Sequence, residues 1–232
     1  MTTSTPEPSQ AQAIKDDIRK AYDDIAPAYL DWTKPSYKTR LVYLNKLLSH
    51  LSQKPKVNVL ELGCGAGVPC TQLLAARENF SVTANDISHA QIELARERLP
   101  SSVRLVEGDM MGLESEEEEF DAVVGFFSIL HLPREEQIVF FNRAFGWLKP
   151  GGWLLANLTK VGFESVKDEK WLGGKEGTMF WSGWGVEKSC EILEEAGFVV
   201  EVKDVVSEAE KDWEGKDNVE FLWVMARKPD GP

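Results

Sequence analysis

Cysteine is scarce in this chain, and long apolar runs are missing from it. The 232 residues include three cysteines, Cys64, Cys70 and Cys190, and none of them is spaced with histidine as metal ligands are. This usage predicts a reduced, intracellular protein without a metal site. No apolar run approaches the length of a membrane-spanning helix, and the opening residues lack the apolar segment of a signal peptide. We therefore expect a cytoplasmic protein with no membrane partner.

Basic residues are also few. The chain has 26 Lys and Arg against 38 Asp and Glu, which gives a net charge of −12, and it has no Lys/Arg cluster. Nucleic-acid phosphates would be repelled by such a surface, so we expect no nucleic-acid partner. The length and the 43% hydrophobic content suit one α/β domain with a sizeable core. A small-molecule substrate is the expected partner, and the chain is expected to be a monomer or a homodimer.

The N-terminal part differs in pattern from the rest of the chain. Its first nine residues are rich in Ser, Thr and Pro, a composition that predicts disorder. Apolar residues then recur at spacings of three and four in 10–30 and 37–51, which predicts two amphipathic helices. Pro27 is expected to break or kink the first of these helices. The predicted division is a disordered tail, an N-terminal helical cap and a core domain, at residues 1–9, 10–55 and 56–232.

Strands and helices alternate through the first half of the core domain, which predicts parallel strands joined by right-handed crossovers in a doubly wound α/β sheet. Two further strands at the end have no helix between them and predict an antiparallel hairpin at one edge. Residues 160–185 are expected to be irregular, and residues 207–218 to form a charged loop. The seven predicted strands lie near residues 57–62, 80–86, 103–106, 120–127, 153–158, 198–206 and 219–226.

A glycine-rich turn follows the first of these strands in the stretch VNVLELGCGAGVP, residues 57–69. The dinucleotide-binding fingerprint G-x-G-x-x-G would place its third glycine at position 68, which is Val68. The spacing is G-x-G-x-G instead, and it is preceded by an acid at Glu61. Asp86 follows at the end of the next strand, where a carboxylate can accept from both hydroxyls of a ribose. These features favour S-adenosylmethionine over a dinucleotide.

With its remaining motifs the chain resembles the class I S-adenosylmethionine-dependent methyltransferases over about residues 57–226. The segments that carry the resemblance are LELGCGAG, AND, EGDM, FDAVVGFFSILHLP and LKPGGWLL. The segments AYDDIAPAYLDW and MFWSGW are similar to the small-molecule enzymes of the methyltransferase type 11/25 group. The resemblance implies a Rossmann-like, doubly wound seven-stranded sheet, mostly parallel with the last strand antiparallel. It also implies S-adenosylmethionine as cofactor, S-adenosylhomocysteine as product, and no metal.

The resemblance implies roles for residues at the matching positions. Glu61 and the three glycines would line the methionine and ribose, and Asp86 would bind the ribose hydroxyls. Asp109 would accept from the adenine amino group, while Phe127 and its neighbour would lie near the methionine. Cys64 within the turn is expected to be a packing residue of this site rather than a nucleophile. The complete predicted cofactor site is Tyr29, Glu61, Gly63, Cys64, Gly65, Gly67, Asp86, Ile87, Asp109, Met110, Phe126 and Phe127.

Methyl transfer from a sulfonium is an in-line displacement by an N or O nucleophile, and it needs a base only when the nucleophile arrives protonated. His131 lies just past the fourth strand, where it could be that base or could bond the loop or the donor carboxylate instead. Aromatic residues outside the sheet predict an apolar or planar acceptor, or else they pack the cap onto the core. The predicted acceptor residues are Tyr22, His131, Trp171, Phe180, Trp181 and Trp184.

Two alternatives to a methyltransferase stay open on the sequence. A protein that binds S-adenosylmethionine without transferring its methyl group is compatible with the chain, because no single residue is indispensable for the displacement. A nicotinamide-dependent oxidoreductase is disfavoured by Val68.

Overall fold

A seven-stranded sheet forms the centre of the computed structural model, which describes residues 8–211 and 217–231. The strand order is β3-β2-β1-β4-β5-β9-β8. β9 is antiparallel to both of its neighbours, and the other adjacent pairs are parallel. This confirms the predicted doubly wound sheet with its hairpin at one edge. The strands are β1 Val57–Leu62, β2 Phe80–Asp86, β3 Arg104–Glu107, β4 Phe120–Gly125, β5 Leu148–Thr159, β8 Val199–Lys211 and β9 Asp217–Arg227.

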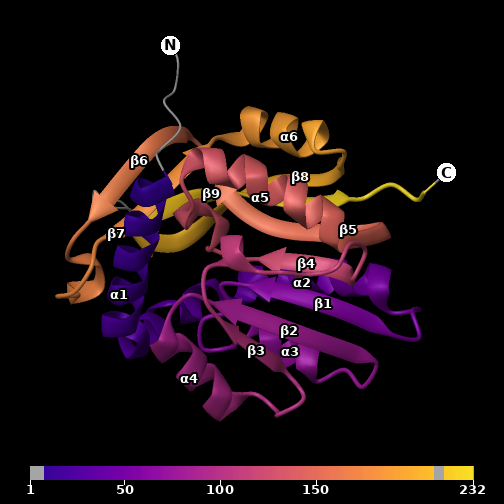
Figure 1. The fold of residues 1–232 in the computed structure, drawn as a ribbon, viewed down its shortest axis with the longest axis horizontal. Helices are drawn as coiled ribbons and strands as arrows, with labels where there is room; N and C mark the ends of the chain where they lie inside the picture. Colours follow the sequence, from indigo (N-terminus) through magenta and orange to yellow (C-terminus); the bar gives the residue numbers. More distant parts are fainter. Residues whose placement is uncertain (1–7, 212–216, 232) are drawn as a thin grey trace.

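Helices cover both faces of this sheet (Figure 1). Successive side chains of a strand point to opposite faces, and β1 accordingly sends Val57 and Val59 into one apolar core and Leu60 and Leu62 into the other. The first core is completed by α2 (Tyr37–Leu51), α3 (Cys70–Ala75) and α4 (His89–Arg98). The second core is completed by α5 (Arg134–Trp147) and α6 (Val186–Glu195). Within the described ranges no helix is both long and apolar enough to cross a membrane.

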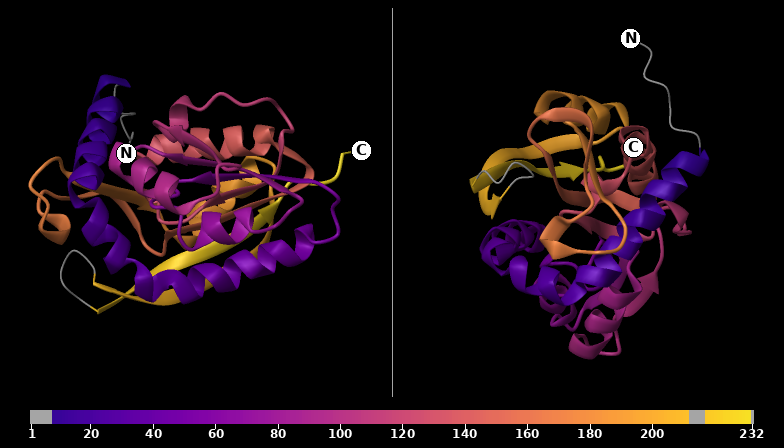
Figure 2. Two further views of the ribbon diagram at one scale, coloured as in Figure 1. Left: turned by 90° about the horizontal axis from the view of Figure 1, so that it is seen from below. Right: turned by 90° about the vertical axis from the view of Figure 1, so that its left-hand side faces the viewer.

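The long helix α1 (Pro8–Trp32) lies at the end of the sheet towards which β1 to β4 point (Figures 1 and 2). Of the expected break or kink at Pro27, the break does not occur, because the helix continues through the proline. A side chain before the proline holds the helix in place. Asp23 accepts hydrogen bonds from the Ser88 hydroxyl at 2.6 Å and the Ala90 N–H at 3.0 Å, and these contacts join α1 to the N-terminus of α4.

The segment 160–185 is not irregular, as the sequence led us to expect. It contains an antiparallel pair, β6 (Gly162–Asp168) and β7 (Met179–Trp184), with a 3-10 turn η4 (Trp171–Gly173) between them. Met179 and Phe180 are both buried against α1, so β7 lacks the alternation that marks a half-buried strand. The pairing of β6 with β7 therefore depends on packing against α1, which ends more than 140 residues before β7. A pattern within residues 160–185 alone could not predict it.

The last two strands are longer than predicted. Residues 207–211 and 217–218 belong to β8 and β9 rather than to a charged loop. β8 is the edge strand, and Glu208 in its added part is buried and accepts from the Thr39 hydroxyl at 3.1 Å. The remaining predicted loop residues, 212–216, and residues 1–7 of the predicted tail lie outside the described residues.

Candidate active site

The glycine turn after β1 opens one wall of a cavity at the end of the sheet. Gly63, Gly65 and Gly67 have φ angles of +66°, +55° and +77°, which glycine adopts without strain. A Cβ on Gly67 would lie 2.6 Å from the Leu99 side chain, so this glycine permits close packing of the turn. A Cβ on Gly65 would approach only Gln91 Oε1, at 3.7 Å. Gly65 therefore leaves the backbone accessible from the cavity side.

Asp86 lies beside this turn at the end of β2. One carboxylate oxygen accepts from the Gly65 N–H at 2.8 Å, and the other accepts from the Ser88 N–H at 2.9 Å. Burial raises the pKa of Asp86 to about 6, although the two backbone N–H groups lower it. The carboxylate is thus mostly ionised at neutral pH. Each oxygen keeps acceptor capacity beyond its backbone bond, so the pair can receive two hydroxyl groups of a ligand.

The inner cavity, as we name the space above the turn, has a volume of about 600 Å³ when the part open to solvent is included. It is bounded by the ends of β1, β2 and β4 and is covered by α1. Gly108, with φ +139°, would meet nothing within 4 Å if it carried a Cβ, so the cavity is open here as it is at Gly65. The lining residues are Lys15, Ile18, Tyr22, Tyr29, Gly63, Gly65, Asn85, Asp86, Ile87, Gln91, Gly108, Asp109, Met110, Phe127, Ser128, His131 and Leu132.

Two buried polar side chains of this lining lack hydrogen-bond partners among the described residues. They are Gln91, through both amide atoms, and Ser128, through its hydroxyl. An unsatisfied buried polar group costs about 1–3 kcal/mol, so such groups usually mark a place for water or a polar ligand. Together with the Asp86 carboxylate and the open glycine turn, they fit a ligand that carries vicinal hydroxyls and further polar atoms.

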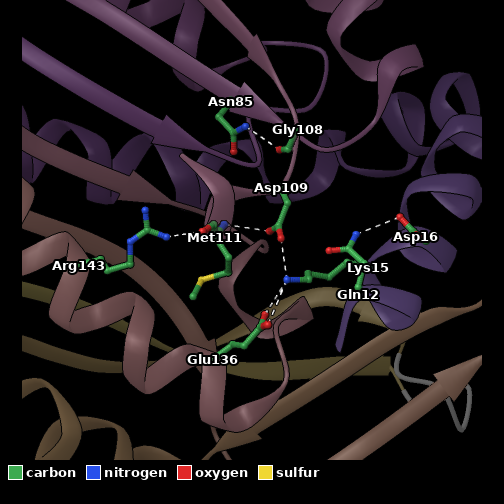
Figure 3. A network of polar contacts seen from close by, with 9 residues as sticks. All are labelled: Gln12, Lys15, Asp16, Asn85, Gly108, Asp109, Met111, Glu136 and Arg143. Carbon is green, nitrogen blue, oxygen red and sulfur yellow. Dashed lines mark hydrogen bonds and ion pairs between the residues drawn. The ribbon is translucent and has the colours of Figure 1, made fainter. Parts of the chain in front are cut away.

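A buried ion-pair network closes the far end of the inner cavity (Figure 3). Lys15 Nζ of α1 lies 2.6 Å from Asp109 Oδ2 and 3.1 Å from Glu136 Oε1, and its side chain is 8% exposed. Asp109 Oδ1 also accepts from the Met111 N–H at 2.9 Å. Arg143 donates to the Met111 carbonyl, and Asn85 donates to the Gly108 carbonyl at 2.8 Å. Lys15 thereby joins α1 to the end of β3 and to α5.

A second space, the aromatic cavity, adjoins the inner cavity and has a volume of about 800 Å³ when the part open to solvent is included. Four residues line both cavities: Tyr22, Tyr29, Phe127 and His131. A group bound in one cavity and a group bound in the other would therefore face each other at these four side chains. The full lining of the aromatic cavity is Tyr22, Tyr29, Trp32, Phe127, Leu130, His131, Thr159, Lys160, Val161, Phe163, Trp171, Trp181, Val219, Glu220 and Phe221.

His131 stands at this junction, in the 3-10 turn η3 (Ile129–His131) after β4. Its Nδ1 lies 2.7 Å from the Phe180 carbonyl, which can only accept, so Nδ1 carries the proton of the neutral ring. Nε2 then accepts from the Tyr22 hydroxyl at 2.9 Å. Burial lowers the pKa of His131 to about 4, while the bond to Phe180 raises it. His131 is consequently neutral at neutral pH and orients the Tyr22 hydroxyl.

The other aromatic rings form one continuous wall. The Tyr22 and Tyr29 rings lie edge to face at 5.1 Å, so the two residues share a face of α1. Trp171 of η4 lies 5.2 Å from Trp32 and 5.5 Å from Trp181. Aromatic pairs in such arrangements stabilise each other beyond their buried area. The wall therefore joins α1, η4 and β7 into one surface facing the cavity.

Several residues predicted for the site lie away from both cavities. The Phe126 ring packs on Trp223 at 5.1 Å, and Trp184 packs under Arg134 at 3.6 Å. Glu61 is buried beneath the turn, where burial raises its pKa to about 7. Phe180 contributes its carbonyl to His131 rather than its ring to a cavity. The predicted residues outside both linings are Glu61, Cys64, Gly67, Phe126, Phe180 and Trp184.

Some lining residues of both cavities were not predicted from the sequence. The spacing of residues along α1 could have indicated those that lie on this helix. Lys15, Tyr22 and Tyr29 follow each other at seven-residue intervals on α1, which places them on one helix face. Trp32 follows Tyr29 by three residues and lies next to it on that face. Gln91 and Ser128 had no comparable signal. The lining residues that the sequence did not indicate include Lys15, Trp32, Gln91, Ser128, Lys160 and Glu220.

Comparison with known proteins identifies the middle of the chain. Residues 59–152 match the family model described as a methyltransferase domain. Botryococcene C-methyltransferase of Botryococcus braunii is 27% identical over 119 residues, which cover 50% of this chain and 31% of that protein. Sterol 24-C-methyltransferase erg6 of Aspergillus fumigatus is 30% identical over 124 residues, which cover 51% and 32%. The matched segment thus spans about a third of the length of these relatives.

Solved structures extend the similarity to nearly the whole chain. The 1,6-didemethyltoxoflavin-N1-methyltransferase of Burkholderia thailandensis, solved with bound 1,6-didemethyltoxoflavin and S-adenosylhomocysteine, has a TM-score of 0.70. The match covers 99% of this chain and 94% of that chain at 19% identity. The shared fold therefore includes α1 and the β6–β7 pair as well as the central sheet.

Proposed function

We propose that this chain belongs to the class I S-adenosylmethionine-dependent methyltransferases, whose domain model it matches over residues 59–152, and that it methylates an N or O nucleophile of a small organic acceptor. The observation that carries the proposal is the pair of adjoining cavities with four lining residues in common. The inner cavity suits the donor and the aromatic cavity suits the acceptor. The names of the similar proteins, which methylate sterols, botryococcene or didemethyltoxoflavin, support a small organic acceptor.

The donor would supply an activated methyl group on a sulfonium, and the residues of this chain would hold it in place. Asp86 would accept from the two ribose hydroxyls, and Gly65 would let the ligand approach the backbone. Gln91 and Ser128 would gain hydrogen-bond partners that they otherwise lack. Asp109 would accept from the adenine amino group with the lone pairs that Lys15 and Met111 leave available.

The displacement mainly requires that the acceptor nucleophile and the donor methyl group be held in line. Tyr22, Tyr29, Phe127 and His131 lie where the two cavities meet, so they would exclude water from the path of the methyl group. Holding two reactants in line can account for roughly 7–11 kcal/mol of a barrier. No metal enters this reaction.

We also propose the cytoplasm as the compartment, since all three cysteines are free thiols.

Two measurements test the proposal. Isothermal titration should show that S-adenosylhomocysteine binds and that NADH does not. A labelled-methyl assay against amines, phenols and thiols should show transfer to at least one class. Tight donor binding without transfer to any acceptor would favour a protein that only binds the donor, and binding of NADH alone would favour an oxidoreductase.

A further inference from the structure

The aromatic cavity has few groups that could accept a proton. Five of its lining residues can titrate: Tyr22, Tyr29, His131, Lys160 and Glu220. Lys160 and Glu220 form an ion pair at 2.5 Å, with side chains 41% and 44% exposed, so they belong to the rim. They do not line the inner cavity, where a donor would lie. Of these five titratable residues, only the two tyrosines and the histidine line both cavities and so lie at the junction.

Neither His131 nor the Tyr22 hydroxyl is suited to act as a base at neutral pH. His131 Nε2 already accepts the Tyr22 hydroxyl, and Nδ1 donates to the Phe180 carbonyl. Burial lowers the pKa of His131 to about 4, so its protonation at pH 7 is disfavoured roughly a thousandfold. Burial also raises the pKa of the Tyr22 hydroxyl, which therefore stays protonated. An acceptor that must lose a proton at the junction would find neither of these two groups ready to take it.

The same wall is well suited to a product that carries positive charge. Tyr22, Tyr29 and Trp171 contribute rings to it, and their centroids lie 5.1 to 6.0 Å apart. Aromatic faces attract cations by about 0.5–2 kcal/mol, with the larger value at desolvated sites. A flat cation would gain this attraction and would also match the apolar surface of the cavity. The rim carries no net charge, because Lys160 is paired with Glu220.

From these observations we infer that the acceptor is a planar heteroaromatic compound that reacts through an unprotonated pyridine-type nitrogen and leaves as an N-methylated cation. The inference rests on the proposed methyl transfer and specifies its substrate class. In the step, the nitrogen lone pair forms the new N–C bond while the C–S bond of the donor breaks. The electron pair of the broken bond remains on sulfur, which becomes a neutral sulfide, and the positive charge moves to the acceptor ring. No proton is transferred.

A matched pair of ligands tests the cavity without requiring turnover. N-methylisoquinolinium and 2-methylnaphthalene have nearly the same shape and differ in charge. We expect the full-length protein to bind the cation at least tenfold more tightly than the hydrocarbon, measured by ligand-observed NMR without donor. Trp171→Leu should reduce this preference about three- to tenfold, and Trp171→Phe, which keeps an aromatic face, should restore most of it. Equal binding of the two ligands, or tighter binding of the hydrocarbon, would overturn the inference.

Turnover gives a second, independent test. With S-adenosylmethionine present, isoquinoline should be methylated with a higher kcat/KM than 2-naphthol or 2-naphthalenethiol, which must each lose a proton. Preference for either proton-losing acceptor would refute the inference and leave methyl transfer intact. Failure of S-adenosylhomocysteine to bind would refute the proposed function instead, and the ligand pair above would still decide the charge preference of the cavity. If the donor binds and no probe is methylated, the relative affinities of N-methylisoquinolinium and 2-methylnaphthalene decide whether the inference holds.

Discussion

Replacing Asp86 by asparagine tests the donor site and separates affinity from stability. The carboxylate accepts from the Gly65 and Ser88 N–H groups and is 7% exposed. Asparagine keeps the shape but turns one acceptor oxygen into an NH₂ group, so one of the two backbone bonds is lost. Bonds from ligand hydroxyls to a charged acceptor contribute about 1.5–3 kcal/mol. We therefore expect Asp86→Asn to weaken S-adenosylhomocysteine binding roughly 10- to 150-fold.

The stability of the same variant should change little, because two effects oppose each other. The shift of the Asp86 pKa from 3.8 to about 6 corresponds to about 3 kcal/mol that burial of the charge costs the folded state at neutral pH. Asparagine removes that cost. It also leaves a backbone N–H without an acceptor, which costs about 1–3 kcal/mol. Urea denaturation at pH 7.5 should accordingly give nearly the same free energy of unfolding for both proteins.

The pH dependence supplies the sharper assay. The folded-state pKa of Asp86 is raised, so the folded chain binds more protons than the unfolded chain between about pH 4 and 6. This group's contribution to stability is therefore present below about pH 4 and is lost as the pH rises through 6. Donor affinity should change in the opposite direction, since only the ionised carboxylate accepts from both hydroxyls.

Titration calorimetry at several pH values can follow this change. Affinity for S-adenosylhomocysteine should fall about tenfold per pH unit below 6 in the natural protein and much less in Asp86→Asn. Glu61, whose pKa is raised to about 7 mainly by burial and in part by the Asp86 charge, also titrates in both proteins, and its pKa should be lower in the variant. Binding by the variant within threefold of the natural protein at pH 7.5 would show that Asp86 does not hold the donor.

Three further substitutions test the junction and the walls. Lys15→Met should lower the free energy of unfolding by about 1–3 kcal/mol in urea, because two partly buried carboxylates lose their common cation; an unchanged value would mean that the ion pairs do not hold α1. Tyr22→Phe leaves His131 Nε2 without its donor and should cost about 1–2 kcal/mol in the same assay; no loss would contradict the assigned bond. Gly65→Ala places a methyl group in the inner cavity at a φ of +55° and should weaken S-adenosylhomocysteine binding at least tenfold by calorimetry. Gly112→Ala, where a Cβ meets nothing within 4 Å, is the matched control and should leave binding unchanged.

The sheet and the glycine turn could be predicted because their signals are local. The central strands β1 and β4 are short, largely apolar runs between turn residues, and Ser88 caps α4 by accepting from the Gln91 N–H. Asp86 and Asp109 could be placed in the site because the ends of parallel strands meet at one edge of a sheet. Both residues line the inner cavity.

The acceptor wall could be predicted only in part, because it combines segments far apart in the chain. Tyr22, Trp171 and Trp181 were expected near an acceptor, and they line the aromatic cavity. Trp184 belongs to the same aromatic segment but points to Arg134, since alternate residues of β7 face opposite sides. The sequence could not distinguish these orientations without the register of β7 against β6 and its packing on α1.

The position of α1 links the two cavities, and it follows from contacts at three places. Lys15 joins the helix to the end of β3, Asp23 joins it to α4, and Tyr22 joins it to His131 after β4. Each contact reaches a different strand or helix within residues 59–152, and Lys15 and Tyr22 themselves line the cavities. A displacement of α1 would therefore open the donor end and remove Tyr22 from the junction together. Because one helix supplies lining to both cavities, a change in the acceptor wall that moves α1 should also alter donor affinity, even where it leaves the glycine turn untouched.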